Sequence, residues 1–259
     1  MAAEGPILEL RGVSKRFGAV QALNEVDFSV APGDVMALVG DNGAGKSTLI
    51  KCVAGIHTVD GGEILFDGEP VSIHGPKDAA ALGIEVVYQD LALCDNLDIV
   101  QNMYLGRERF GSLRRLDELS MEQTARETLK GLAVTTVKSV RQTVAGLSGG
   151  QRQSVAVAKA VMWNSRVVIL DEPTAALGVA QTRQVLDLVK RLGDQGLAVV
   201  IVSHNLNDVF EVADRITVLR LGTDVATFDV ASTNQQKVVE AITSGRPGGR
   251  PEEAEMPAT

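Results

Sequence analysis

The residues best suited to chemistry in this sequence form a glycine-rich loop, Gly40-Asp-Asn-Gly-Ala-Gly-Lys-Ser47. The loop fits the pattern G-x-x-x-x-G-K-[ST] and lies between an apolar run over residues 35–39 and a helical pattern over residues 48–53, the context of a phosphate-binding P-loop. Its glycines allow backbone N–H groups to surround phosphates, Lys46 can reach the terminal phosphates, and the Ser47 hydroxyl can bind Mg²⁺. A flexible glycine turn with an incidental lysine would not require these flanking elements.

Two adjacent carboxylates, Asp171 and Glu172, end the apolar run over residues 167–170. Because side chains alternate along a strand, the two carboxylates point in different directions and can have different roles. We expect Asp171 to orient Mg²⁺ through water, and Glu172 to polarise the water that attacks a γ-phosphate. The alternative is that the two carboxylates simply end the strand in solvent. The P-loop in the same chain favours a role in catalysis over that alternative.

Gln89 and His204 follow two further apolar runs, over residues 84–88 and 198–202. Ligands of open α/β sheets bind beyond the carboxyl ends of the strands, so these positions and the P-loop predict one shared site. There His204 can contact the γ-phosphate, although a lone histidine is more often a surface or capping residue. The Gln89 amide oxygen could reach Mg²⁺ or the attacking water, and is weak evidence by itself.

A second glycine-rich stretch, Leu147-Ser-Gly-Gly-Gln-Arg-Gln153, precedes an alanine- and valine-rich helical segment. A serine and two glycines at the start of a helix expose N–H groups and the positive end of the helix dipole, which attract phosphate. This loop has no lysine of the kind that the P-loop carries. It therefore raises the question of which phosphate it serves.

The elements that must position these residues are those of an α/β protein. Uninterrupted, β-branched apolar runs predict parallel strands buried on both faces, over residues 35–39, 167–170 and 198–202. Less regular strands, over residues 7–11, 25–30 and 63–67, predict an antiparallel flank. Residues 183–193 form an amphipathic helix, expected to pack on the sheet.

The pattern changes between residues 91 and 161, where residues 116–134 have helical spacing with many charges and no comparable buried strand appears. We expect a core made of residues 1–90 and 162–244, and a helical subdomain inserted over residues 91–161. Residues 245–259 are rich in Gly, Pro and Glu and predict a disordered tail.

The composition limits the choice of partners. With 33 acidic and 25 basic residues the net charge is −8, which argues against general binding to nucleic acid or anionic lipid without excluding a local basic patch. Two cysteines, Cys52 and Cys94, are too few for a disulfide framework or a zinc site and favour a reducing cytoplasm. The sequence has no signal peptide and no apolar run near the about 20 residues of a spanning helix, so another polypeptide would have to bring it to a membrane.

The motifs GDNGAGKST, VYQD, LSGGQRQ, VVILDEPT and SHN have the order and spacing seen in nucleotide-binding subunits of ATP-binding cassette (ABC) transporters. The resemblance covers nearly all of residues 5–245. It implies a P-loop NTPase with a RecA-like core, and ATP and Mg²⁺ as cofactors. It also implies an aromatic side chain stacked on adenine, for which Phe17 stands in the expected place; a core phenylalanine is the alternative.

The site residues implied by the resemblance fall into three groups. The catalytic residues are Glu172 as base, His204 as switch, Gln89 and Lys46. The metal-binding residues are Ser47, Gln89 and Asp171. The nucleotide-binding residues are Phe17, Gly40, Asn42, Gly43, Ala44, Gly45, Lys46, Ser47, Thr48, Ser148, Gly149, Gly150 and Gln151.

In this family the LSGGQ motif, here Leu147–Gln151, closes over the ATP of a partner cassette rather than over the nucleotide of its own chain. The missing lysine is then supplied by the partner, and ATP binding implies a homodimer or a heterodimer with another cassette. One departure concerns the sequence after EPT, where Gly178 replaces an aspartate that contacts the partner. Communication across the dimer is expected to differ. Tyr104 and Trp163 are expected to be packing residues.

The sequence looks most like importer ATPases of monosaccharide permeases, of the ribose, xylose and fructose type, through GIEVVYQDLALCDNLDIVQNMYLGRE and PTAALGVAQT. That resemblance implies an ATPase on the cytoplasmic face of the membrane, held by a permease through residues 91–104 and served indirectly by an extracytoplasmic sugar-binding protein. A DNA-repair or ribosome-associated cassette would use the same ATP clamp, but such proteins carry long basic, zinc or coiled-coil insertions. A regulatory subunit that does not hydrolyse ATP would not need Glu172.

Overall fold

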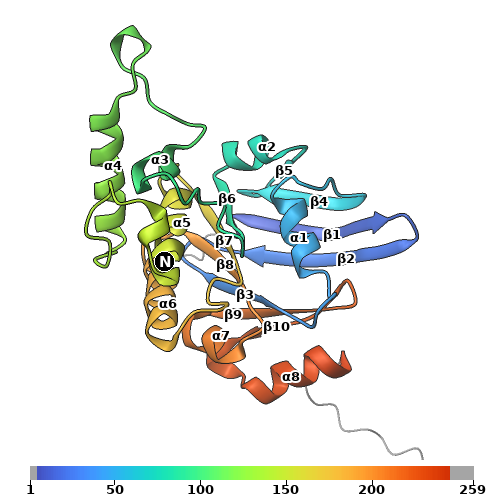
Figure 1. Ribbon diagram of the computed structural model, residues 1–259. Coiled ribbons are helices and arrows are strands. Elements are labelled where there is room, and N and C mark those ends of the chain that lie inside the picture. Colours follow the sequence, from blue (N-terminus) through green and yellow to red (C-terminus); the bar gives the residue numbers. More distant parts are fainter. Residues whose placement is uncertain (1–4, 246–259) are drawn as a thin grey trace, which may run out of the picture.

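Two β-sheets of different kinds organise the computed structural model, which describes residues 5–245 (Figure 1). The smaller sheet is antiparallel, with the strand order β2-β1-β4-β5. The larger has the order β10-β9-β3-β8-β7-β6, and its strands are parallel except for the edge strand β10. The strands are β1 (Leu8–Phe17), β2 (Val20–Val30), β3 (Val35–Val39), β4 (Gly61–Phe66), β5 (Glu69–Val71), β6 (Ile84–Val87), β7 (Val167–Asp171), β8 (Ala198–Val202), β9 (Arg215–Arg220) and β10 (Thr223–Asp229).

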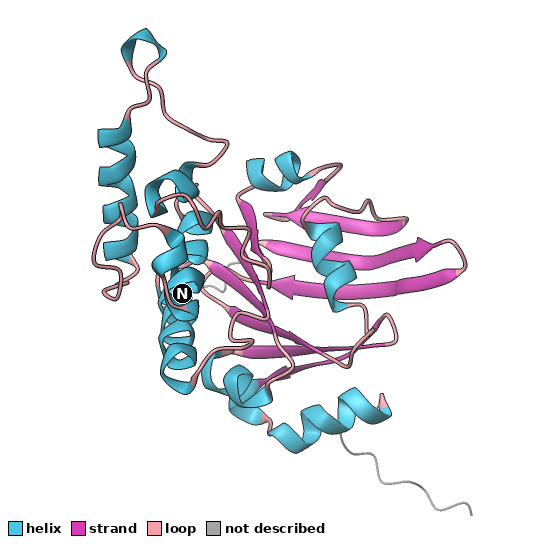
Figure 2. Ribbon diagram, in the orientation of Figure 1, coloured by secondary structure: helices cyan, strands magenta, loops and turns pink. Residues whose placement is uncertain are grey.

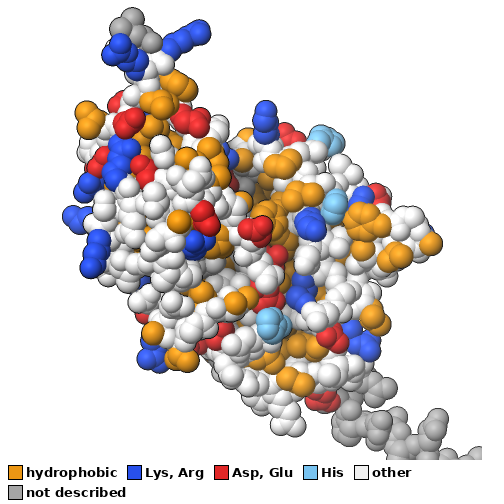
Figure 3. Space-filling model, in the orientation of Figure 1, with side chains coloured by type: hydrophobic (Ala, Val, Ile, Leu, Met, Phe, Trp, Pro, Cys, Tyr) orange, Lys and Arg blue, Asp and Glu red, His pale blue; other side chains and the backbone are white. Residues whose placement is uncertain are grey.

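Helices gather mainly on one side of the sheets (Figure 2). They are α1 (Lys46–Val53), α2 (Pro76–Ala81), α3 (Ile99–Tyr104), α4 (Glu118–Gly131), α5 (Gly149–Val161), α6 (Val179–Asp194), α7 (Leu206–Val212) and α8 (Gln235–Ser244), with short 3₁₀ turns at Ser112–Arg114, Val144–Gly146 and Val230–Ser232. None of the helices between residues 5 and 245 is long and apolar enough to cross a membrane. Basic side chains are grouped over α4 and the segment before it (Figure 3).

Two hydrophobic cores lie on opposite faces of the large sheet. Along β3 the side chains alternate between them: Val35, Ala37 and Val39 face one core, and Met36 and Leu38 face the other. The first core contains the buried faces of α3, α4, α5 and α6, and the second contains α1 and the antiparallel sheet. The helical segment after β6 therefore packs on the sheet through a shared core.

The expected parallel core, antiparallel flank and helical segment are all present, and the predicted amphipathic helix is α6. The residue bounds of the two predicted subdomains remain a prediction. The antiparallel strands are longer than expected: β1 continues to Phe17 and turns into β2 at Val20. The sequence pattern predicted shorter strands because polar side chains at the outward-facing positions interrupt the apolar runs. Tyr104 and Trp163 pack edge to face with ring centroids 5.4 Å apart, as expected of packing residues.

The tail predicted over residues 245–259 lies outside the described residues except for Gly245. That glycine ends α8 with φ 74°, the left-handed conformation common at helix ends.

Candidate active site

The loop from Gly40 to Ser47 joins β3 to α1 and depends on its glycines. Gly40, Gly43 and Gly45 have φ values of 151°, 79° and 107°. A Cβ atom at Gly40 would lie 2.1 Å from the Leu219 carbonyl oxygen, and one at Gly45 would lie 2.9 Å from that of Ala22. Only glycine satisfies both the dihedral angles and these close approaches. Gly45 is the N-cap of α1, so the first N–H groups of that helix are free to donate to an anion.

The Lys46 side chain folds back toward the start of this loop. Its Nζ donates hydrogen bonds to the carbonyl oxygens of Gly40, at 2.7 Å, and Asp41, at 3.0 Å. Burial lowers the pKa of the ammonium group, while the nearby carboxylates of Glu172, Asp41 and Asp171 act in the opposite direction. The loop therefore holds a cation at its centre, where a phosphate would be surrounded by N–H donors.

A cavity of about 460 Å³ opens beside the P-loop and brings most of the predicted site together. The predicted residues that line it are Asn42, Gly43, Ala44, Gly45, Lys46, Ser47, Thr48, Gln89, Asp171 and Glu172. Sequence reasoning missed its other walls, namely Val20, Gln21 and Ala22 on β2, Val202 at the end of β8, and Leu221 and Gly222 between β9 and β10. Gly18, just before β2, and Gly222 were the only available signals in the sequence.

Asp171 and Glu172 follow each other at the end of β7 but have different surroundings. Burial, together with the charge of Glu172, raises the pKa of Asp171, and Lys46 and Lys51 oppose that rise. Glu172 has φ 50°, a conformation that is rare for residues other than glycine and that marks a locally strained backbone. Its N–H donates to the carbonyl oxygen of Val202, which fixes this turn against β8.

His204 meets Glu172 directly. The distance from His204 Nδ1 to Glu172 Oε2 is 2.9 Å, and the side chains are 72% and 16% exposed. The carboxylate is thus enclosed and oriented, while most of the imidazole remains accessible to a ligand. The structure places P-loop, carboxylates and histidine at one edge of the sheet, as the sequence predicts.

The donor atoms in the cavity suit a hard divalent cation such as Mg²⁺. The Ser47 hydroxyl, the Gln89 amide and the Asp171 carboxylate all line the cavity and offer oxygen ligands. Within residues 5–245 no group of three or more His, Cys, Asp or Glu side chains could hold a metal by itself. Mg²⁺ usually keeps waters and takes substrate phosphate oxygens as ligands, so a few protein oxygens beside a phosphate loop fit it.

Phe17 belongs to neither hydrophobic core and is 44% exposed, so the alternative of a core phenylalanine is wrong. Its ring contacts His57 edge to face at 5.0 Å, and Lys15 Nζ lies 5.5 Å from its centroid. Phe17 pairs in the hairpin with Val20, which lines the cavity. The ring is therefore available near the cavity, and its stacking on adenine remains a prediction.

The second glycine-rich stretch, residues 147–153, is the second phosphate loop predicted from the sequence. It lies at the N-terminus of α5 and does not line the P-loop cavity. Ser148 caps α5 by accepting from the Gln151 N–H at 3.4 Å, and Gln151 Oε1 accepts from the Ser148 N–H at 2.9 Å. A Cβ atom at Gly149 would lie 2.9 Å from Leu177 Cδ2, and one at Gly150 would lie 3.0 Å from Gln181 Cβ. These glycines allow close packing against the start of α6 as well as access to N–H groups.

The segment before this loop is fastened to the segment that follows Gln89. The N–H groups of Val144 and Ala145 donate to the carbonyl oxygens of Leu97 and Asp95, each at 3.0 Å. The Arg152 guanidinium, at the start of α5, pairs with the Asp95 carboxylate at 2.8 Å. Two backbone hydrogen bonds and one ion pair therefore tie residues 95–97 to the start of α5 and the turn before it.

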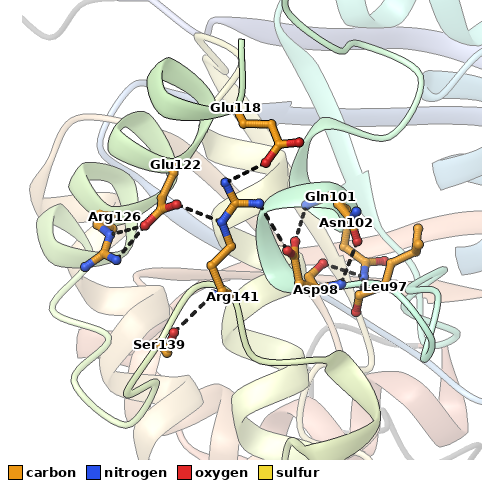
Figure 4. A network of polar contacts seen from close by, with 9 residues as sticks. All are labelled: Leu97, Asp98, Gln101, Asn102, Glu118, Glu122, Arg126, Ser139 and Arg141. Carbon is orange, nitrogen blue, oxygen red and sulfur yellow. Dashed lines mark hydrogen bonds and ion pairs between the residues drawn. The ribbon is translucent and has the colours of Figure 1, made fainter. Parts of the chain in front are cut away.

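Arg141 forms the centre of a charged network in the same region (Figure 4). Its guanidinium reaches Glu122 at 2.7 Å and Glu118 at 3.2 Å on α4, and Asp98 at 3.3 Å at the N-cap of α3. Arg126 pairs with the same Glu122 from the neighbouring turn of α4. One arginine thus joins two helices to the strand-like segment that leads into the second phosphate loop.

Gly178 is the N-cap of α6 with φ −75°, a conformation that any residue adopts. A Cβ atom there would meet only Gln181 Oε1, at 3.9 Å. Nothing in the described fold excludes an aspartate at this position.

Comparisons with known proteins agree on one family for this chain. The family model described as ABC transporter matches residues 23–175, more than half of the chain. The fructose import ATP-binding protein FrcA of Rhizobium meliloti is 50% identical over 226 residues, which cover 85% of this chain and 87% of that protein. The xylose/arabinose import ATP-binding protein XylG of Sulfolobus acidocaldarius is 44% identical over 238 residues, 92% of this chain and 94% of that protein.

A third relative is longer. The ribose import ATP-binding protein RbsA 1 of Rubrobacter xylanophilus is 47% identical over 219 residues, which cover 84% of this chain and 43% of that protein. These relatives support the transport interpretation over a DNA-repair or ribosome-associated cassette.

Among solved structures, a nucleotide-free ATP-binding cassette from an ABC transporter matches with a TM-score of 0.79 and 26% identity over 91% of this chain and 98% of that one. A dimeric bacterial ABC transporter cassette matches with a TM-score of 0.73 and 25% identity over 86% of this chain and 98% of that one. These likenesses confirm the expected fold class.

Proposed function

Because this chain belongs to the ABC transporter family, as an ATP-binding subunit, we propose that its ATPase activity powers import of a monosaccharide through a separate membrane permease. The observation that carries the proposal is the single cavity that holds the P-loop, Gln89, Asp171 and Glu172, with His204 on Glu172. Relatives whose names specify import of fructose, xylose, arabinose or ribose support a sugar as the substrate.

Each residue has a role in hydrolysis that its position allows. Lys46 and the N–H groups of the P-loop bind the β- and γ-phosphates and offset their charge. Glu172, enclosed and held by His204, accepts a hydrogen bond from the attacking water and orients it. His204 can also contact the γ-phosphate, which links the histidine to the state of the nucleotide. Ser47, Gln89 and Asp171 would hold Mg²⁺, which supplies charge neutralisation at the phosphate oxygens.

The second phosphate loop supports a dimer in which each chain completes the other's site. Residues 148–151 do not line the cavity of their own chain, and their helix start offers N–H groups, a hydroxyl and a positive dipole end. We infer that ATP joins two cassettes head to tail, in a homodimer or with a different cassette. Loss of the γ-phosphate removes contacts from both sides and loosens the pair.

The permease contact is assigned to the exposed part of residues 91–104. In that stretch Ala92, Asp95, Asn96 and Gln101 are exposed, whereas Ile99 to Tyr104 otherwise face the core. A permease bound there would hold the subunit on the cytoplasmic face of the membrane. The extracytoplasmic sugar-binding protein would act on the permease and reach this chain only through it.

The proposed hydrolysis is tested by Glu172→Gln. Removing the base should lower the rate of ATP hydrolysis by about 10²- to 10⁴-fold while ATP binding and ATP-driven dimerisation persist. The readouts are phosphate release and size-exclusion chromatography with ATP. Glu69→Gln, at an exposed position on β5, is the matched control and should behave as the wild type. An unchanged hydrolysis rate in Glu172→Gln would show that another group is the base.

Import is tested separately in cells. Deletion of the gene should abolish uptake of one labelled sugar among fructose, xylose, arabinose and ribose, and the Glu172→Gln variant should not restore that uptake. Normal uptake of all four sugars in the deletion strain would contradict a role in their import.

A further inference from the structure

An arm formed by residues 106–117 projects from the helical segment beyond the rest of the molecule (Figure 1). It is a small antiparallel ribbon: the Gly111 N–H donates to the Arg115 carbonyl oxygen, and the Asp117 N–H donates to the Arg109 carbonyl oxygen, each at 2.9 Å. Phe110 and Leu116 form the bridge between these bonds, and the 3₁₀ turn Ser112–Arg114 makes the tip. The proposed reaction leaves this arm without a role.

The arm exposes large apolar side chains. Phe110 is 62% exposed and Leu116 is 49% exposed, and Leu119, on the first turn of α4 beside the arm, is 83% exposed. Phe110 and Leu116 form a non-hydrogen-bonded pair, the arrangement in which opposite side chains stand closest on one face of a ribbon. None of the three belongs to the two cores of the described chain. Exposed apolar side chains grouped in this way mark an interaction surface.

The charge of the arm opposes that of the whole chain. Residues 106–117 contain four arginines and two acidic residues, and the stretch from Arg109 to Leu116 contains three arginines and no acidic residue, in a protein of net charge −8. Arg109 is engaged with Thr124 at 3.0 Å and with the Tyr104 ring at 5.3 Å. Arg114 and Arg115 are exposed and have no ion pair within the part of the chain that the structure describes. Figure 3 shows basic side chains at the tip of the projection.

We propose that the arm binds the surface of an anionic lipid bilayer, with Arg114 and Arg115 at the phosphate headgroups and Phe110, Leu116 and Leu119 in the interfacial layer. The proposal rests on the proposed function, which brings this chain close to a membrane. Each arginine near an anionic surface strengthens binding about fivefold. Aromatic and apolar side chains beside basic residues suit the headgroup boundary.

The alternative occupant, a protein surface, is less favoured by the shape of the arm. The apolar pair stands on a projecting ribbon rather than in a hollow, so a protein partner would have to supply both a groove and carboxylates. A bilayer needs no preformed groove. Because the chain as a whole is repelled by anionic lipid, approach through the arm is the favourable orientation, and this would orient the cassette beneath its permease.

The test is co-sedimentation of the full chain with vesicles, without nucleotide or permease, so its result does not depend on the proposed ATPase reaction. We expect the wild type to bind phosphatidylcholine vesicles containing phosphatidylglycerol at low salt, and not vesicles of phosphatidylcholine alone. The double substitution Arg114→Glu and Arg115→Glu should weaken binding by at least about 30-fold. Phe110→Ser with Leu116→Ser should weaken it without changing the net charge.

The matched control is the double substitution Arg183→Glu and Lys190→Glu, which makes the same change in charge at exposed positions on α6. Binding by this control should fall far less than that of the Arg114 and Arg115 variant. Equal losses in the two variants would mean that net charge alone governs binding and would overturn the proposal. Absence of wild-type binding to anionic vesicles would also overturn it.

Discussion

Among the residues of the site, Asp171 is the one whose pKa is raised by its surroundings although lysines lie nearby. Its carboxylate is partly buried next to Glu172, and both effects raise its pKa, although Lys46 and Lys51 lie nearby. A folded-state pKa above the unfolded one means that ionised Asp171 costs folding free energy at neutral pH. That cost diminishes as the pH falls through the folded-state pKa.

Asp171→Asn should therefore stabilise the protein in the absence of nucleotide. The amide keeps the size of the side chain and removes the charge, so we expect the Tm at neutral pH to rise by about 2 °C. The difference from the wild type should shrink in acidic buffer, where the wild-type carboxyl is protonated. Thermal denaturation at several pH values measures both effects.

The same variant should lose the additional stabilisation that ATP with Mg²⁺ gives the wild type. A Tm below that of the wild type at neutral pH would show that Asp171 is a stabilising ion partner of Lys46 instead.

The parts of the site that could be predicted are those whose reactive side chains stand at fixed positions in a sequence motif. The P-loop, Asp171, Glu172 and His204 follow recognisable strands, so their meeting at one sheet edge could be predicted. The cavity walls Val20–Ala22 and Leu221–Gly222 could not, because they come from the start of β2 and from the turn between β9 and β10 and carry no reactive group. The positive φ of Glu172 accompanies its hydrogen bond to Val202 on β8, a tertiary contact that no local pattern reveals.

At the scale of elements, Arg141 shows how the helical segment is positioned. It joins carboxylates on α4 and α3 and stands in the stretch that leads into the second phosphate loop. The helical spacing of residues 116–134 could predict the existence of α4. Its ion pairs with the rest of the helical segment could not be predicted, since Asp98, Glu122 and Arg141 are far apart in sequence. Charged residues on a helix surface usually have no such partner.

Arg141→Met should lower the free energy of unfolding by about 1–2 kcal/mol, because Asp98 and Glu118 would lose the cation that they share with Glu122, which would keep only Arg126. Arg126→Met is the control on the same Glu122; its pair is exposed and spans one turn of a helix, and its loss should cost no more than about 0.5 kcal/mol. Chemical denaturation measures both. Equal costs would mean that the network around Arg141 adds nothing to a simple surface pair.

At the scale of the whole molecule, the proposed dimer gives the two phosphate loops of one chain different sites. The P-loop lines the cavity, and Ser148 at the start of α5 does not. The sequence alone could identify both loops, but their separation depends on how α5 and β3 are placed around the large sheet. In the dimer proposed above, a single chain would contribute two half-sites.

Ser148→Arg should leave ATP binding by the monomer within about twofold of the wild type and prevent ATP-driven dimerisation, because the bulky cation would occupy the partner's phosphate position. Ser148→Ala is the control for the lost helix cap, which costs about 1 kcal/mol, and it should still dimerise. Nucleotide titration and size-exclusion chromatography give the two readouts. A parallel loss of monomer binding would mean that the loop serves its own chain's nucleotide.

The large sheet, with a separate core on each face, also has a thermodynamic consequence. Leu49 on α1 and Leu186 on α6 are each 1% exposed and belong to different cores. Leu49→Ala and Leu186→Ala should each cost about 2–5 kcal/mol, and the double variant should cost their sum within about 0.5 kcal/mol. A larger deviation would mean that the strands transmit strain from one core to the other. Additive losses would make the sheet an energetic partition, so that mutations accumulate independently on its two faces.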